Sequence, residues 1–317
     1  MNSFEANYKK ILEVLRVITK KENFLTQIKK PKLTDIELIA MNLTAEYLSI
    51  DSECQLFRVI PDNLKTKIER SVFNRRKRKL FSSIEFIRNE LSLKFTEFED
   101  YFIVDNKPLE VTKLSRSSIS KICRENFDTA PNKGYCASQK IQYYGYKIHA
   151  VCSIEGVFKS FDLSKASVHD IHYLKDIKNQ FNNCVILGDK GYLSTDYQLD
   201  LFTSKNIKLE VPMRKNQTSY KRQPYIFRKK RKRIETLFSQ LCDQFMIRRN
   251  YAKSFNGFKT RILSKITAVT IIQYINKFTF GRNINNLKIS ILCTTGIRNL
   301  LSCKFHLFTN WHFILKF

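Results

Sequence analysis

Long apolar runs are missing from this 317-residue sequence. A membrane-spanning helix needs roughly 18 or more apolar residues in succession, and the longest candidate, residues 266–275, is short and contains Thr and Gln. The N-terminal stretch MNSFEANYKK also has no apolar core of the kind that signal peptides carry. We therefore expect a cytoplasmic protein with no membrane association.

Acidic residues are scarce as well. Asp and Glu together number 29 against 56 Lys and Arg, which gives a formal net charge of +27. Such an excess disfavours a metabolic enzyme with neutral partners and predicts a polyanionic partner, with nucleic acid first and an anionic membrane surface second. Hydrophobic residues make up 43% of the chain, so a folded protein with a sizeable core is expected, in one large domain or two ordinary ones.

Several sequence motifs are absent, and each absence excludes a class of site. None of the eight cysteines forms a C-x-x-C pair, which argues against a zinc ribbon and favours reduced, buried thiols in the cytosol. No phosphate-binding loop of the form G-x-x-x-x-G-K-[ST] is present, so ATP use is not expected. A nucleophile elbow is also absent, which disfavours a Ser/His/Asp triad.

Residues 1–95 have the pattern of a helical region. Thr34 is followed three residues later by Glu37, which is a capping box at a helix start. Further helices are expected over 51–60, where Pro61 ends the helix, and over 81–93. A basic run lies between them and consists of Arg75, Arg76, Lys77, Arg78 and Lys79. Short helices with a basic cluster are typical of a helix-turn-helix-like DNA-binding region; the alternative is a solvated basic face.

The pattern changes to strands near residue 98. We expect strands over 101–105, 142–154, 157–164, 184–189 and 207–213, with a hairpin turn at Glu155-Gly156, and helices over 168–181, 194–206, 229–246 and 255–279. Three strands followed by alternating helices and strands indicate an α/β fold with a mixed sheet, in a second domain of residues 96–280. The C-terminal tail, 281–317, has no assigned structure.

Two aspartates follow apolar runs that are predicted strands. Asp105 comes directly after YFIV, and Asp189 follows CVIL after a single glycine. Ligands gather at the carboxyl ends of strands in sheets of this kind, so the two carboxylates would meet if their strands are neighbours. Two close carboxylates are costly unless a cation joins them, and Mg²⁺ prefers oxygen ligands. The alternatives are a helix cap for Asp189 and a turn residue for Asp105.

A third carboxylate is expected from the helix over 229–246. Glu235 lies at the edge of that helix's apolar stripe, and Arg231 lies one turn earlier. The basic residues around it are Arg228, Lys229, Lys230, Lys232 and Arg233. A metal-bound carboxylate in such surroundings suits a phosphodiester substrate, although a simple ion pair between Glu235 and Arg231 would also explain the spacing.

Five ordered blocks carry a resemblance to a known family: IVDNKPLEV, NKGYCASQKIQYYGYKIHAVCSIEG, LSKASVHD, VILGDKGYLS and RKRIETLFSQL. Together with KLTDIELIAMNLTAEYL and FNRRKRKL, they resemble bacterial DDE transposases of the insertion-sequence 982 family, from about residue 5 to 290. The resemblance implies an RNase H-like catalytic domain and a metal-binding catalytic triad of Asp105, Asp189 and Glu235. It also suggests that Lys147 and His149 border the site.

This sequence departs from the wider supergroup at the helix that carries Glu235. That helix often has Tyr seven residues before the glutamate, Arg four before and Lys seven after. Arg231 keeps the middle position, whereas Arg228 and Cys242 stand at the other two. The departure affects the groups that would grip terminal phosphates and leaves the triad untouched.

The expected function is therefore transposition. The chain would bind the terminal inverted repeats of its element and the target DNA as a homodimer, associated with the bacterial nucleoid, and would cut and join DNA with Mg²⁺ or Mn²⁺. The alternatives are a nuclease of the same fold without strand transfer and a non-catalytic DNA-binding relic of a transposase. The two basic runs are also compatible with nuclear import signals.

Overall fold

The computed structural model describes residues 4–95, 100–214, 216 and 220–292. Its N-terminal part is helical, as predicted, and is made of α1 (Phe4–Ile18), α2 (Asp35–Tyr47), α3 (Glu53–Val59), α4 (Asp62–Lys65), α5 (Arg70–Lys79) and α6 (Phe81–Leu93). The capping box is confirmed, because the Thr34 side chain accepts from the backbone N–H of Glu37 and the Glu37 side chain accepts from that of Thr34. Helix α3 ends just before Pro61, also as predicted.

A mixed six-stranded sheet forms the second part. Its strands are β1 (Tyr101–Thr112), β2 (Asn132–Cys136), β3 (Ile141–Ser153), β4 (Phe158–Lys165), β5 (Cys184–Leu187) and β6 (Ile207–Glu210). The order is β2-β3-β1-β5-β6, with β4 also paired to β3. The pairs β1–β3, β2–β3 and β3–β4 are antiparallel, whereas β1–β5 and β5–β6 are parallel. An antiparallel three-strand meander that continues into parallel strands is the RNase H-like arrangement that the resemblance implied.

Several strand predictions need correction. The strands expected over 184–189 and 207–213 are shorter, since β5 ends at Leu187 and β6 at Glu210. Strand β1 does not end at Asp105 but continues to Thr112, because its antiparallel pairing with β3 continues far beyond its short pairing with β5. Asp105 is therefore in mid-strand and is not a turn residue. Strand β2 was not predicted, since most of its side chains are exposed or half-buried and leave no apolar pattern in the sequence.

The predicted helices of the second part also shift in places. The helix expected over 168–181 is a short 3₁₀ turn, Asp170–Tyr173, followed by α7 (Leu174–Gln180). Helix α8 (Thr195–Lys205) lies as predicted, and α9 (Tyr225–Asp243) starts about one turn earlier than expected. The last helix, α10 (Phe255–Tyr274), continues into a π-helical turn, Ile275–Thr279.

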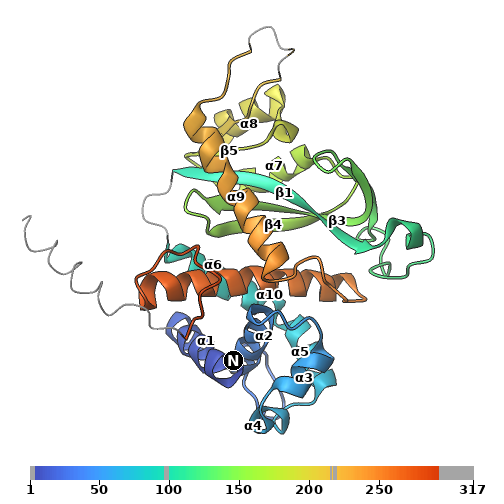
Figure 1. The fold of residues 1–317 in the computed structure, drawn as a ribbon, viewed down its shortest axis with the longest axis vertical. Helices are drawn as coiled ribbons and strands as arrows, with labels where there is room; N and C mark the ends of the chain where they lie inside the picture. The colour runs from blue at the N-terminus through green and yellow to red at the C-terminus, as the bar shows by residue number, and fades with distance from the viewer. Residues whose placement is uncertain (1–3, 96–99, 215, 217–219, 293–317) are drawn as a thin grey trace, which may run out of the picture.

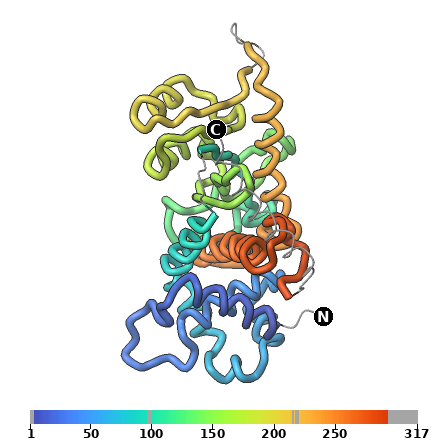
Figure 2. Tube along the Cα trace, turned by 90° about the vertical axis from the view of Figure 1, so that its left-hand side faces the viewer, coloured from blue at the N-terminus to red at the C-terminus, as the bar shows by residue number. Residues whose placement is uncertain are grey.

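Helices cover both faces of the sheet (Figures 1 and 2). Helix α9 crosses one face in front of β1, and α7 and α8 lie on the other. The alternation of β1 follows this division: Phe102 and Val104 join the core under α7 and α8, whereas Ile103 joins the core under α9. Side chains two residues apart on a strand share a face, so Asp105 lies on the α9 face with Ile103.

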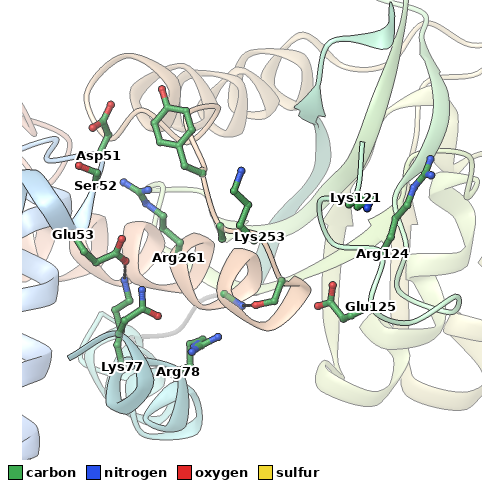
Figure 3. A pocket seen from close by; sticks show the side chains of 15 residues that line it. Asp51, Ser52, Glu53, Lys77, Arg78, Lys121, Arg124, Glu125, Lys253 and Arg261 are labelled. Carbon is green, nitrogen blue, oxygen red and sulfur yellow. Dashed lines mark hydrogen bonds and ion pairs between the residues drawn. The ribbon is translucent and has the colours of Figure 1, made fainter. Parts of the chain in front are cut away.

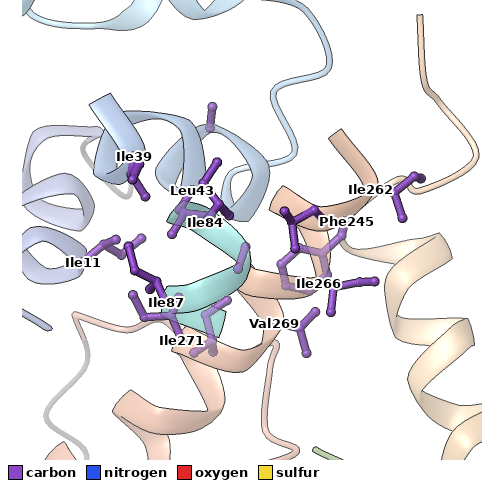
Figure 4. Packing of buried hydrophobic residues seen from close by; sticks show 14 of the residues in the cluster. Ile11, Ile39, Leu43, Ile84, Ile87, Phe245, Ile262, Ile266, Val269 and Ile271 are labelled. Atoms are coloured by element: carbon purple, nitrogen blue, oxygen red, sulfur yellow. The ribbon is translucent and has the colours of Figure 1, made fainter. Parts of the chain in front are cut away.

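Helix α10 lies between the sheet and the N-terminal helices (Figure 1). It packs against α2 and α6 on one side and against α9 and β4 on the other. Nearly every side chain from Thr260 to Gln273 is buried, which goes beyond the single apolar stripe that its sequence indicates. One continuous core therefore joins the two parts of the chain, as the close-up of Ile39, Ile84 and Ile266 shows (Figure 4).

The C-terminal tail is described only as far as residue 292. Ile291 is fully buried, and its backbone N–H donates to the hydroxyl of Tyr47 (3.3 Å); residues 293–317 lie outside the described residues. No helix within the described residues is long and apolar enough to cross a membrane. The six cysteines that the structure describes are free, and Cys54 is exposed, contrary to the expectation of buried thiols throughout.

Candidate catalytic site

The register between β1 and β5 places Asp105 and Asp189 near one another. Ile103 pairs with Leu187 where the two parallel strands lie side by side. Both residues belong to the core under α9, and each is followed two positions later by an aspartate. Asp105 stays within β1, whereas Asp189 lies just past the end of β5. Period-two alternation thus directs both carboxylates to the α9 side of the sheet.

Local hydrogen bonds hold the two aspartates. One oxygen of Asp105 accepts from the backbone N–H of Asn106 (2.8 Å). Asp189 accepts from the backbone N–H of Lys190 (2.6 Å) and caps a 3₁₀ turn, Lys190–Tyr192. The cap of α8 is Ser194, not Asp189. Asp189 therefore does cap a short turn, but the longer helix after it does not depend on this carboxylate.

Glu235 enters the site from α9. The neighbouring residues Ile234 and Leu237 are fully buried and fix the rotation of this helix on the sheet, which leaves the Glu235 side chain about half exposed. Arg231, one turn earlier, lies 3.2 Å from the Glu235 carboxylate and 4.0 Å from that of Asp189. The Arg231 guanidinium thus lies between the carboxylate of Asp189, just past the end of β5, and the carboxylate of Glu235 on α9.

The charges of the three acids act on one another. The pKa of Asp105 is raised to about 7, chiefly by burial and in smaller part by the negative charges of Asp189 and Glu235. The hydrogen bond from Asn106 and the positive charge of Arg231 oppose this rise. All three carboxylates and Arg231 therefore influence one another electrostatically. The positive charge of Arg231 is too small an effect to offset the burial of Asp105.

Comparison with known proteins gives the family. Residues 96–271 match the sequence profile described as "Transposase DDE domain", which spans more than half of the chain and includes all three acids. The chain belongs to the transposase DDE domain family. No curated protein matches the chain. Among solved structures, the "Mos1 transposase paired-end complex with left transposon end" matches with 8% sequence identity and a TM-score of 0.22 over 83% of this chain and 84% of that chain.

The acids of this DDE transposase domain suit a divalent metal by their chemistry. Carboxylate oxygens are the ligands that Mg²⁺ and Mn²⁺ prefer, and Asp105 is a half-buried carboxylate with an elevated pKa. Within the described residues, however, no three such side chains lie close enough to hold an ion together. Arg231 already bridges two of them. A metal site would therefore require this guanidinium to withdraw and the carboxylates to close.

Lys147 and His149 lie on β3, next to β1, on the face opposite Asp105. Lys147 donates to Asp170 and to the carbonyl of Val168, both at 2.9 Å. His149 is buried, its ring stacks on Tyr173, and its Nε2 is 2.8 Å from the hydroxyl of Ser164. Burial lowers the pKa of His149 to about 4. Both side chains hold neighbouring segments in place, and neither is paired with a triad acid.

The basic cluster on α5 divides into inward and outward members. Arg76 pairs with the buried Asp35 and donates to the carbonyl of Leu33, and the buried Lys77 pairs with Glu53 (2.6 Å). The three remaining members are exposed: Arg75, Arg78 and Lys79. Two of the five cations are thus already paired with acids that lie far away in the sequence.

The basic cluster on α9 lies on the helix that carries Glu235. Lys229, Lys230 and Lys232 are exposed, whereas Arg228 and Arg233 are half-buried. The guanidinium of Arg228 lies over the ring of Tyr225, 5.8 Å from its centre. These three lysines form no ion pair within the part of the chain that the structure describes, so they can approach a polyanion without breaking one.

Proposed function

We propose that this chain is a transposase of the insertion-sequence 982 type, which acts on DNA in the bacterial cytoplasm. It would bind the terminal inverted repeats of its element, cleave there, and join the exposed 3′ ends to target DNA. The observation that supports this best is the convergence of Asp105, Asp189 and Glu235 on Arg231 within a DDE transposase domain. The strongly positive net charge fits a DNA substrate.

The three acids would hold Mg²⁺ or Mn²⁺, and the ions, when bound, would activate the attacking oxygen and stabilise the leaving one. The protein contributes rigidity: β1 and β5 fix Asp105 and Asp189 relative to each other, and α9 adds Glu235. A nearby cation favours the ionised form of a carboxylic acid, so metal binding would counter the raised pKa of Asp105. Arg231, released from its two carboxylates, would be free to meet a phosphate oxygen.

The exposed cations of α5 and α9 would contact DNA phosphates. These contacts would position the duplex and carry no base specificity. Two transposon ends must be cut and joined together, so we propose that the active assembly is a homodimer.

The test is a cleavage and strand-transfer assay on end-labelled DNA that carries the element's own terminal repeats. The reaction is run with Mg²⁺, with Mn²⁺ and with EDTA, and the wild type is compared with Asp189→Asn. This substitution keeps the size and the acceptor oxygen and removes the charge. We expect metal-dependent nicking and joining in the wild type, and a loss of at least about 100-fold in the variant with DNA binding retained.

Asp196→Asn is the matched control, because Asp196 is an exposed acid in the first turn of α8. It should cleave and join like the wild type. Nicking without joining would identify a nuclease of the same fold. DNA binding by the wild type without any product would identify a non-catalytic relic. If Asp189→Asn cleaved and joined DNA as well as Asp196→Asn does, Asp189 would have no role in the reaction.

A further inference from the structure

A basic cavity of about 680 Å³ lies where the N-terminal helices meet the DDE domain (Figure 3). Four segments that are distant in the sequence line it, and one of them, 51–53, contributes two acids, Asp51 and Glu53. Helix α5 contributes Arg78, the loop after β1 contributes Lys121 and Arg124, and the segment before α10 contributes Lys253. The cavity contains none of the three triad acids, so it is a feature distinct from the candidate catalytic site.

Four of the cations that line this cavity have no acidic partner within the described residues. Arg78, Lys121 and Lys253 are exposed and form no ion pair. Arg124 is also exposed, and it donates only to neutral oxygens, which include the Tyr144 hydroxyl (2.9 Å) and the Ser117 carbonyl (2.7 Å). These bonds hold the guanidinium in a fixed position without reducing its charge.

Two other cations of the cavity have acidic partners inside the protein. Lys77 pairs with Glu53, and Arg261 pairs with the buried Glu46. Glu125 accepts from the backbone N–H of Phe255 and so satisfies the first turn of α10. Asp51 and Glu125 also line the cavity, and neither forms an ion pair among the described residues. The four cations without an acidic partner outnumber these two acids, so an excess of positive charge remains, which a bound anion would offset.

We propose that this cavity binds the phosphodiester backbone of duplex DNA and holds the helical region and the DDE domain on one DNA segment. The inference rests on the proposed function and adds a contact surface to it. Arg78 belongs both to the cavity and to the exposed face of α5, so the positive surface continues from Arg75 and Lys79 into the cavity. A polymer can follow such a continuous surface, whereas a free nucleotide would occupy only the cavity.

Salt-dependent binding tests this proposal. The full chain is titrated against a fluorescent DNA duplex of arbitrary sequence, because phosphate contacts do not depend on sequence. Each lost phosphate contact lowers the slope of log K against log [salt] by about 0.9, which is roughly an eightfold loss of affinity at 0.1 M salt. We expect that loss for Lys121→Gln and for Lys253→Gln, and roughly a 60-fold loss for the double variant if the two effects add.

Two further variants serve as controls. Lys175→Gln removes the same charge from an exposed position on α7, outside the cavity, and should leave the slope unchanged. Glu125→Gln keeps an acceptor for the α10 terminus but removes a negative charge from the cavity, so it should bind DNA more tightly than the wild type. Far-UV circular dichroism confirms that each variant is folded.

The outcomes separate this proposal from the proposed function. Unchanged slopes in both cavity variants, in a chain that still cleaves and joins DNA, would overturn the cavity assignment alone. Reduced slopes in a chain that makes no product would support the cavity and count against catalysis. A competition with ATP and inorganic phosphate completes the test: if these small anions bind the cavity while the variants keep wild-type affinity for DNA, the site takes free phosphates and the proposal fails.

Discussion

Replacing Glu46 by Gln should destabilise the protein strongly, because Glu46 is the anion that two buried cations share. The side chains of Glu46, Lys265 and Arg261 are only 4%, 1% and 6% exposed. They lie at the contact between α2 and α10, where the helical region meets the DDE domain. Lys265 also donates to the carbonyl of Phe245.

The size of the effect follows from the charge that each substitution leaves behind. Glu46→Gln leaves two buried cations without their anion, and breaking a buried pair in this way costs about 3–5 kcal/mol. Lys265→Met instead leaves Glu46 paired with Arg261 at 3.4 Å. Its main cost is the unsatisfied carbonyl of Phe245, about 1–3 kcal/mol. We therefore expect Glu46→Gln to be the more destabilising of the two.

Urea denaturation followed by far-UV circular dichroism measures both values. A second readout is pH. Burial lowers the pKa of Lys265, and Glu46 opposes that shift, so the pKa should fall further in Glu46→Gln. The unfolded chain then holds a proton that the folded chain releases, and raising the pH toward the ordinary lysine pKa should restore stability to this variant. Equal destabilisation by both substitutions, or no recovery at high pH, would refute the reasoning.

Two other predictions concern the strands around the candidate site. The pKa of His149 is about 4 in the folded protein and near 6.5 in the unfolded chain, so acidification from pH 6.5 to 4 should remove about 3 kcal/mol of stability from the wild type. Urea titrations of His149→Gln should lack this pH-dependent loss, and parallel pH curves for both proteins would contradict it. Gly145→Ala should lower the melting temperature and weaken DNA cleavage. A Cβ at this position would lie 2.1 Å from the carbonyl oxygen of Leu109 on β1, the strand that carries Asp105. A variant that melts at the wild-type temperature would contradict this, because it would show that β1 and β3 can move apart at no cost.

Local sequence was sufficient for the helices and for most strands. Hydrophobic periodicity and capping residues act over a few positions, so the capping box at Thr34 and Glu37, the helix 81–93 and the strand that begins at Cys184 all followed from neighbouring residues. Net charge, which does not depend on the fold at all, pointed to a polyanionic partner. The unexpected strand β2 and the length of β1 depend on pairing with β3 and left no such local trace.

The candidate site required both levels of information. The sequence identified Asp105, Asp189 and Glu235 as acids at the ends or edges of elements, and through the resemblance as a triad. Only the tertiary structure pairs Ile103 with Leu187 and lays α9 across that point. Such contacts join residues many positions apart, and no local pattern specifies which strands become neighbours.

The basic residues show most clearly what the sequence determines and what the tertiary structure decides. The sequence determined how many cations the chain carries and where they form runs, and it favoured 75–79 and 228–233 on that ground. The tertiary structure decided which of them remain free for a partner: Asp35 and Glu53 turn Arg76 and Lys77 inward, whereas Lys121 and Lys253, isolated in the sequence, converge in one cavity. The physical reason is that ion pairing and burial depend on distance in space, and folding alone sets that distance.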